Sequence, residues 1–566
     1  MSPQPLLTGR LADALKISPL LAQCLVNRGL TDTAAAEFFL RPMLKQLADP
    51  FLVPNMAAAV DRLFAARERG ELIVIFGDYD VDGVTSTALL VEMMRALGWK
   101  VEPYLPSRLD EGYGLSRDGV ENCLKRIPAK LLLAVDCGST ATATVRWLDQ
   151  QGVDVIVLDH HQVASPSPEV IALVNPQLAP AGAPSFRELC SAGLAFKLAH
   201  ALVKRGRERG LPEALAYDIR QFLDLVALST IADLVPLTGE NRILVNAGLD
   251  RLRRTERPGL RALKTVAQVP AVVGVYEVGF QLAPRLNAAG RLETATAALE
   301  LLLAADLAAA EPLARDLDTR NRERQRIERS IADEVIGAVR ARFNPETDFA
   351  IVEGQLLWHI GVVGIVASRV LREFYRPTII LGGDGEQWRG SGRSIEGFDL
   401  AAALVQCDDL LLRHGGHAMA AGLSIKPDQL DAFRARLNGL ARQTLRPEHL
   451  KQTLRLDAEV PLGELTLDRL EELEQLEPVG QGNPSVQLLA RNVSLQGAPQ
   501  RMGRDQQHLK LKVTDGAVAH GAVLWNCGEH ANIGAGRFDL AFAPQINEFN
   551  GRRLVQLKVL DWRPAE

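Results

Sequence analysis

The stretch that decides the fold is VDVIVLDHH at residues 153–161, where an apolar run ends in an acid and two histidines. Two other apolar runs also end in acidic residues, IVIFGDYDVDG at 73–83 and LLLAVD at 131–136. Short apolar runs that alternate with amphipathic helical segments predict βαβ units and a mainly parallel sheet. In such a sheet, chemistry takes place beyond the carboxyl ends of the strands. The sequence therefore predicts an α/β fold with acidic and imidazole side chains gathered at one sheet edge.

Carboxylates crowded at such an edge repel one another unless a cation lies between them. One pair at 4 Å costs roughly 4 kcal/mol at an effective dielectric of about 20. Divalent cations relieve this repulsion, so the pattern predicts a metal-dependent phosphoester enzyme. A single Asp-x-Asp after a strand is equally explained as a helix N-cap. Three strands with such ends, one of them followed by Asp-His-His, favour the metal site.

Five residues of these motifs are candidate ligands or supports of a metal centre. Asp80 and Asp82 can aim both carboxylates at one point, and Asp136 can bridge two ions. His160 offers an imidazole nitrogen, and Asp159 can orient the histidine rings. A mixed oxygen and nitrogen set suits Mn²⁺ or Mg²⁺, and two such ions would clamp a phosphate and supply a hydroxide nucleophile.

The composition is that of an ordinary globular protein. The 566 residues are 47% hydrophobic and 23% charged, with a net charge of −5. No run of 18 apolar residues occurs and the start lacks a secretory pattern, so we expect neither a membrane span nor a signal peptide. The six cysteines form no Cys-x-x-Cys pair, which argues against a disulfide framework and a structural zinc site and predicts a cytoplasmic protein. Binding to a polyanion would need local basic patches.

The pattern along the chain predicts five segments. They are an N-terminal segment at 1–55, a catalytic α/β domain at 56–290, a connector helix at 291–345, a second α/β domain at 346–450 and a C-terminal domain at 451–566. Within the connector, residues 293–342 predict nearly continuous helix, and 318–326 are polar on every face. This favours a helix that bridges two domains through solvent. After residue 453 the hydrophobic period changes to two, which predicts a small antiparallel barrel.

The motifs resemble those of a known superfamily. GDYDVDG at 77–83, DCG at 136–138 and DHH at 159–161 are similar to successive motifs of the DHH phosphoesterases. GGHAMAAG at 415–422 resembles the phosphate-binding signature of their companion DHHA1 domain. The order of parts, with a connector helix and a terminal barrel, is similar to the superfamily's single-strand-specific 5′→3′ DNA exonucleases. The resemblance identifies 56–290 as a DHH domain, 346–450 as a DHHA1 domain and 451–566 as an OB-like nucleic-acid-binding barrel.

Carried over by position, the resemblance implies a full set of metal ligands. These are Asp80, Asp82, Asp136, His160 and Asp233, with Asp136 as the bridging ligand. The superfamily's pyrophosphatases have a histidine at the position of Phe76, so Asp78 or water would complete the first metal's shell. His161 would touch the scissile phosphate.

The resemblance also implies substrate contacts in the catalytic domain. Arg108, in PSRLDEGYGL at 106–115, would bind phosphate, and Tyr113 could stack a base. Arg285 and Asn287, in PRLNAAGR at 284–291, are further candidates. The alternatives are a solvated loop arginine at 108, a buried anchor at 113, and a helix cap or salt-bridge element at 285–287.

The second α/β domain has its own candidates for phosphate binding. They are Ser368, Arg369, Ser391, Arg393, His414, Gly415, Gly416 and His417. Glycines let backbone N–H groups approach phosphate oxygens, and a helix start favours anions.

The C-terminal domain combines basic and aromatic residues. Lys510, Lys512, Arg552, Arg553 and Lys558 lie near Trp525 and Phe549 in sequence. This is how OB folds hold single strands without reading sequence. The alternative is a core tryptophan with solvated lysines.

The expected function is a single-stranded-DNA-specific 5′→3′ exonuclease of DNA repair and recombination. It would release mononucleotides by two-metal hydrolysis, as a monomer, with a single-strand-binding protein and a helicase as expected partners. The alternatives are a DHH phosphoesterase for short oligonucleotides or cyclic dinucleotides and a non-catalytic replication scaffold.

Overall fold

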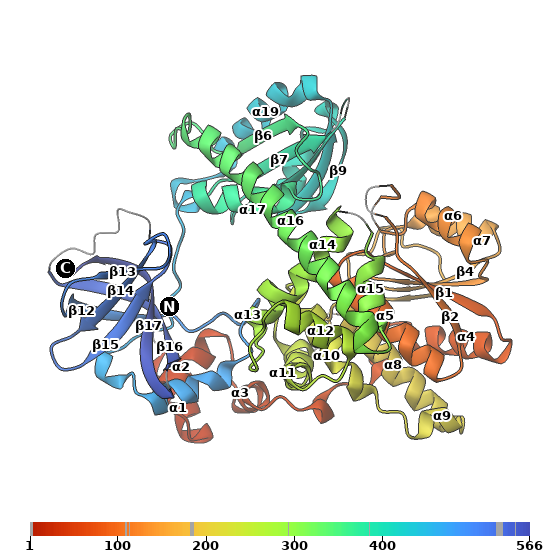
Figure 1. Ribbon diagram of the computed structural model, residues 1–566, viewed down its shortest axis with the longest axis horizontal. Helices are drawn as coiled ribbons and strands as arrows, with labels where there is room; N and C mark the ends of the chain where they lie inside the picture. The colour runs from red at the N-terminus through yellow and green to blue at the C-terminus, as the bar shows by residue number, and fades with distance from the viewer. Residues whose placement is uncertain are drawn as a thin grey trace.

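The computed structural model describes residues 4–107, 110–112, 114–180, 186–292, 294–383, 385, 387–527, 536–549 and 551–565 (Figure 1). The catalytic sheet has five parallel strands in the order β2-β1-β3-β4-β5. They are β1 (Leu72–Gly77), β2 (Lys100–Tyr104), β3 (Leu131–Val135), β4 (Asp154–Leu158) and β5 (Ala172–Val174). The chain moves outward from β1 to β2 and then reverses to β3, which makes the β1–β3 edge the switch point where such sheets bind ligands.

Both faces of this sheet are buried, which explains why its strands are continuous apolar runs. Ile73 and Ile75 of β1 enter the core beneath α5 (Val81–Ala96), α8 (Ser191–Glu208) and α10 (Leu223–Ala232). Val74 and Phe76 point to the other face, where α6 (Arg117–Arg126) and α7 (Thr142–Gln150) cover them. The predicted parallel α/β architecture is therefore confirmed.

Helices complete the catalytic domain. They are α4 (Met56–Glu68), α9 (Pro212–Leu215), α11 (Gly239–Arg253), α12 (Pro258–Val266), α13 (Val275–Glu277), the π-helical turn η5 (Val278–Leu282) and α14 (Ala283–Leu292). Between α9 and α10 lies a 3₁₀ turn (Ile219–Phe222), which Asp218 caps.

The connector contains a long helix, α16 (Leu307–Arg340), which runs from the catalytic domain to the second α/β domain (Figure 1). The nearly continuous helix predicted over 293–342 is confirmed, with one break where α15 (Thr296–Leu303) ends and Asp306 caps α16. The bridge through solvent is wrong. Asp318, Asn321 and Arg324 are buried, together with Glu328. Arg285 of the catalytic domain bonds Asp318, and Arg369 of the second domain pairs with Glu328. Within the helix, Arg324 bonds Asn321 and Glu328.

The second α/β domain has a mixed sheet in the order β6-β7-β8-β10-β9. Its elements are β6 (Ile351–Leu356), α17 (Val363–Phe374), β7 (Thr378–Gly383), β8 (Trp388–Arg393), α18 (Leu400–Val405), β9 (Leu411–His417), β10 (Ala420–Ile425) and α19 (Leu430–Thr444). The glycine-rich signature forms the β9–β10 hairpin.

The C-terminal domain is a curled sheet in the order β11-β12-β16-β17-β15-β14-β13. Its elements are β11 (Ala458–Glu459), α20 (Leu467–Leu473), β12 (Leu488–Leu495), β13 (Gln500–Met502), β14 (His508–Thr514), β15 (Ala519–Leu524), β16 (Phe538–Phe549) and β17 (Arg552–Pro564). A short β12–β14 pairing brings the sheet back on itself, as an OB-like barrel requires. The expectation of purely antiparallel strands is wrong, because β11–β12 and β15–β17 are parallel.

The N-terminal helices α1 (Pro5–Leu15), α2 (Pro19–Asn27) and α3 (Thr33–Leu40) pack into the same core as the barrel. The buried Arg242 joins this body to the catalytic domain. Its guanidinium donates hydrogen bonds to backbone carbonyls of Phe39, Gln475, Leu476, Glu477 and Pro478. Among the described residues, no helix has the length and apolar character needed to cross a membrane.

Candidate metal centre and substrate groove

The metal candidates from four separate segments meet at the β1–β3 edge. His160 Nε2 lies 3.5 Å from Asp136 Oδ1, 3.5 Å from Asp233 Oδ2 and 3.7 Å from Asp82 Oδ2. Three overlapping groups could each hold an ion: Asp78, Asp80 and Asp136; Asp82, His160 and Asp233; and Asp136, His160 and His161. Asp136 and His160 each belong to two of these groups, and Asp136 has the two carboxylate oxygens that a bridging ligand needs.

Asp80 and Asp82 are held by backbone amides. Asp80 caps α5 by accepting hydrogen bonds from the N–H groups of Asp82 and Gly83, so the N-cap interpretation holds for this residue as well. Asp82 accepts from the N–H groups of Ser191 and Ala192 at 2.7 and 2.8 Å. These amides begin α8, and the positive end of a helix stabilises a carboxylate there.

Asp136 is the most constrained member of the cluster. Its φ is +64°, in the left-handed region that side chains rarely adopt, and only 2% of it is exposed. Its Oδ1 accepts a hydrogen bond from Ser191 Oγ at 2.9 Å. Backbone strain of this kind persists where the surrounding structure enforces it, and it concentrates at functional sites.

The carboxylates of the cluster repel one another when no cation is bound. Burial, followed by repulsion from Asp82, Asp80 and other carboxylates, raises the pKa of Asp136 well above its usual value. The same causes raise the pKa of Asp233 to about 9, and burial lowers the pKa of His160. The buried atoms His160 Nε2 and Asp233 Oδ2 make no hydrogen bond within the described residues. This donor set of carboxylate oxygens and imidazole nitrogen fits Mn²⁺ or Mg²⁺.

The second histidine has different surroundings. His161 Nδ1 lies 2.7 Å from Asp159 Oδ1, and Asp159 also accepts from Ser139 N–H at 3.0 Å. Burial opposes protonation of His161, but the hydrogen bond and charge of Asp159 outweigh it and raise the pKa of His161 to about 9. Burial of Asp159 is likewise outweighed by His161, so the pKa of Asp159 lies well below its usual range. Asp159 thus positions His161, while His160 faces the carboxylates.

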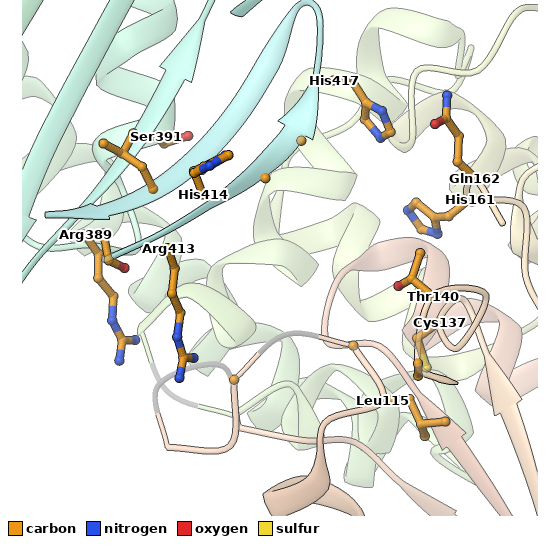
Figure 2. A pocket seen from close by; sticks show the side chains of 18 of the residues that line it. Leu115, Cys137, Thr140, His161, Gln162, Arg389, Ser391, Arg413, His414 and His417 are labelled. Atoms are coloured by element: carbon orange, nitrogen blue, oxygen red, sulfur yellow. The ribbon is translucent and has the colours of Figure 1, made fainter. Parts of the chain in front are cut away.

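A groove of about 1030 Å³ separates the metal edge from the second α/β domain (Figure 2). Asp159, His161 and Thr140 line its catalytic side. The opposite side is formed by the β8 and β9 region, from which the predicted residues Ser391, His414, Gly415, Gly416 and His417 line the groove. At Gly416, where φ is +138°, a Cβ would lie 2.5 Å from Ala421 Cα, so this turn requires glycine.

Two arginines of this groove were missed by sequence reasoning. Arg389 on β8 and Arg413 on β9 both pair with Ser424 on the intervening strand β10, and Figure 2 shows their side chains pointing the same way. Arg389 precedes Ser391 by two residues, so strand alternation from that serine would have indicated it.

The remaining predicted substrate residues lie in several environments. Arg108 and Tyr113 lie outside the described residues. Arg285 donates to Asp318 at 2.9 Å. Asn287 accepts from Val81 N–H at 3.2 Å, in the loop of residues 78–82 that carries candidate ligands (the metal loop). Ser368 donates to Gly364 within α17, and Arg369 pairs with Glu328 at 2.7 Å.

Two further predicted positions lie in the sheet of the second domain and in the barrel. Arg393 donates to Ser391 Oγ at 3.0 Å, which places it beside the groove. In the barrel, Trp525 is 46% exposed and packs edge-on against His508, so the core interpretation of this residue is wrong.

Comparison with known protein families agrees with this architecture. Residues 72–230 match the DHH family, N-terminal domain, 347–443 the DHHA1 domain and 456–561 the RecJ OB domain. The single-stranded-DNA-specific exonuclease RecJ of Bacillus subtilis is 38% identical over 98% of this chain and 69% of its own length. The protein of the same name from Dickeya dadantii is 38% identical over 95% of both chains.

A solved structure gives the same result in three dimensions. The crystal structure of RecJ in complex with Mn²⁺ from Thermus thermophilus matches with a TM-score of 0.83 and 32% identity, over all of this chain and 78% of that one. Full-length identity above 30%, three matching domains and the shared fold together show that this chain belongs to the RecJ family.

Proposed function

We propose that this chain is a single-stranded-DNA-specific exonuclease that degrades DNA from the 5′ end to mononucleotides by two-metal phosphodiester hydrolysis. The observation that carries the proposal is the Asp136 cluster, which includes His161, beside a groove that His161 lines and whose opposite side contributes glycines, histidines and arginines. Relatives of this chain are named single-stranded-DNA-specific exonucleases, and related crystal structures are described with Mn²⁺ or Mg²⁺.

Two ions, held by Asp78, Asp80, Asp82, Asp136, His160 and Asp233, would supply a hydroxide nucleophile and charge neutralisation at the phosphate. Ser191 and Ala192 fix the Asp82 carboxylate, so this ligand needs no reorganisation when substrate arrives. His161, kept protonated by Asp159, would donate a hydrogen bond to a phosphate oxygen. Arg108, Ser391, Arg393 and the His414–His417 hairpin would hold the strand and its terminal phosphate.

Selectivity for single strands would follow from a groove whose walls lie too close together to admit a duplex. Trp525 and the basic residues of the barrel would bind the strand farther from its 5′ end, by stacking and phosphate contacts. We further propose that the enzyme acts as a monomer in the cytoplasm, with a single-strand-binding protein and a helicase as partners. Its six cysteines are all unpaired, as suits a reducing compartment.

The test is a degradation assay with purified protein on end-labelled single-stranded DNA, duplex DNA, a cyclic dinucleotide and pyrophosphate. Each substrate is incubated with Mn²⁺, Mg²⁺ or chelator. We expect metal-dependent loss of the single strand from its 5′ end and no comparable loss of the other three. Labelling the two ends separately tests the polarity. Preferred cleavage of the cyclic dinucleotide or pyrophosphate, or no cleavage at all, would contradict the proposal.

A further inference from the structure

An exposed pair of stacked aromatic rings lies between the metal centre and the barrel. Tyr276 and Phe280 have ring centroids 5.0 Å apart and planes 28° apart. They are 62% and 67% exposed, although rings of this size are normally buried. Leu234 and Val272, in neighbouring segments, are exposed as well. The rings thus form a stacking surface that the described protein does not cover.

The backbone connects this pair directly to the metal centre. Phe280 lies in the π-helical turn η5, a kind of irregularity that is frequent at functional sites. η5 packs against α10, the helix that delivers Asp233, and an added Cβ at Gly279 would lie 3.8 Å from Ile231. η5 continues into α14, where Asn287 binds the metal loop through Val81 N–H. Seven residues separate Phe280 from Asn287, roughly 10 Å along a helix.

On the side away from the metal centre, the aromatic pair lies beside hollows that lead to the barrel. Tyr276 lines a hollow of about 820 Å³ together with Gln545 of β16 and Glu474, Glu477 and Val479. A neighbouring hollow of about 550 Å³ is also lined by Glu474, Glu477, Val479 and Gln545, but not by Tyr276, and it continues to Gln556 and Lys558 of β17. Figure 1 shows α13 at the edge of the catalytic domain that faces the barrel. A continuous groove therefore leads from a basic residue of the barrel to Tyr276.

The charges and aromatic rings of this groove determine whether it binds the bases or the phosphates of a strand. Glu277, Glu474 and Glu477 line the hollow at Tyr276, and their carboxylates repel phosphates. Arg41 and Arg253 line the same hollow but are paired with Glu37 and Asp250. Aromatic faces bind nucleobases regardless of their identity, and each stacked base is worth about 1–3 kcal/mol. On the basis of the proposed function, we infer that Tyr276 and Phe280 form a base-stacking platform. It holds unpaired bases of the substrate strand between the metal centre and the barrel, with the phosphates turned away from the glutamates.

The test compares a long and a very short 5′-phosphorylated single strand in steady-state kinetics. The Tyr276→Ala/Phe280→Ala variant should raise KM for the long strand about 5- to 100-fold, because stacking of the bound bases is lost. Its kcat should stay near that of the unaltered protein, since no metal ligand changes. A dinucleotide cannot reach the platform, so its KM should not change. Leu215→Ala, at an equally exposed position on α9, is the matched control and should change the KM for neither substrate.

Two further variants separate stacking from simple apolar contact. Tyr276→Phe/Phe280→Tyr should keep the KM of the unaltered protein, whereas Tyr276→Leu/Phe280→Leu should lose affinity as the alanine variant does. Abasic residues scanned along the long strand should weaken binding at one or two positions in the unaltered protein and have no such effect in the alanine variant. Equal KM values for the alanine variant and the unaltered protein, or full affinity with leucines, would overturn the inference. Absence of single-strand degradation by the unaltered protein would instead refute the proposed function.

Discussion

His161 Nδ1 lies 2.7 Å from Asp159 Oδ1, and this contact gives the two adjacent histidines opposite properties. The carboxylate raises the pKa of His161 to about 9, so its ring is cationic at neutral pH. The pKa of His160 is lowered, chiefly by burial, so its ring is neutral and can ligate a metal. One aspartate thus gives neighbouring histidines a cationic ring, which suits a phosphate contact, and a neutral ring, which suits a metal.

We predict that Asp159→Asn lowers kcat/KM by about 10- to 100-fold, the usual effect of removing a residue that orients metal-site groups. The pH profile gives a second readout. Without the negative charge at 159 the pKa of His161 falls, so its ring loses the proton at lower pH. The alkaline limb of kcat/KM should therefore move to lower pH. Asp149→Asn, on the exposed end of α7, is the control and should leave the profile unchanged.

A second prediction is that Asp136 is required for activity but destabilises the metal-free protein. Asp136→Asn should reduce turnover at least about 100-fold, because the bridging carboxylate is lost and this exceeds the effect of a supporting residue. In the presence of chelator, the same variant should melt at a higher temperature than the unaltered protein at neutral pH. The reason is that the amide removes a buried carboxylate whose pKa is raised by burial and by its neighbours. An unchanged activity would refute the ligand assignment, and a lower Tm in chelator would refute the electrostatic argument.

Metal binding should change the pH dependence of stability. In the metal-free protein, Asp233 has a pKa of about 9 when folded, above its ordinary value when unfolded. Such a group stabilises fully below the unfolded pKa, and this stability is lost as pH rises toward 9. The Tm gain on adding Mn²⁺ should therefore grow between pH 5 and 9. When the Mn²⁺ concentration is a hundred times Kd, binding stabilises the folded protein by about 2.7 kcal/mol. Thermal melts with Mn²⁺ and with chelator measure this difference. A gain that is constant with pH would contradict it, and Ca²⁺ at equal concentration tests ion selectivity.

The sequence was sufficient to predict the parts of the site that follow from strand geometry. Asp80, Asp136 and His160 each lie within three residues of the end of a buried parallel strand, and adjacent parallel strands end at one edge. Asp233 could not be predicted in this way, because it follows a helix whose direction depends on tertiary packing. The amides of Ser191 and Ala192, which hold Asp82, have no sequence signal for the same reason.

The polar connector shows how burial can mislead a prediction from periodicity. Hydrophobic patterning treats a charged stretch as solvated, but Asp318, Arg324 and Glu328 are buried because each has charged or hydrogen-bonding partners. Arg324 pairs with Glu328 on the same helix, whereas Asp318 and Glu328 also pair with Arg285 of the catalytic domain and Arg369 of the second domain. Only the three-dimensional arrangement brings Arg285 and Arg369 to the helix. The packing of α1 and α2 against the barrel depends likewise on long-range contacts.

The last prediction tests whether this network fixes the two α/β domains relative to each other. Glu328 is buried and accepts from Arg324 Nη1 at 2.8 Å while pairing with Arg369 Nε at 2.7 Å. Glu328→Gln removes the charge that compensates the buried Arg324 guanidinium, and breaking a buried ion pair in this way costs about 3–5 kcal/mol.

We expect urea unfolding to begin at lower concentration in Glu328→Gln and kcat/KM on single-stranded DNA to fall, since the groove lies between the two domains that the network joins. Glu311→Gln on the same helix is the matched control. Its partner Arg315 and Glu311 itself are both exposed, so the cost there should be below about 1 kcal/mol. If Glu328→Gln lost stability without any loss of kcat/KM, the network would support folding but not the alignment of the groove. Equal behaviour of the two variants would show that the buried pair contributes no more than an exposed one.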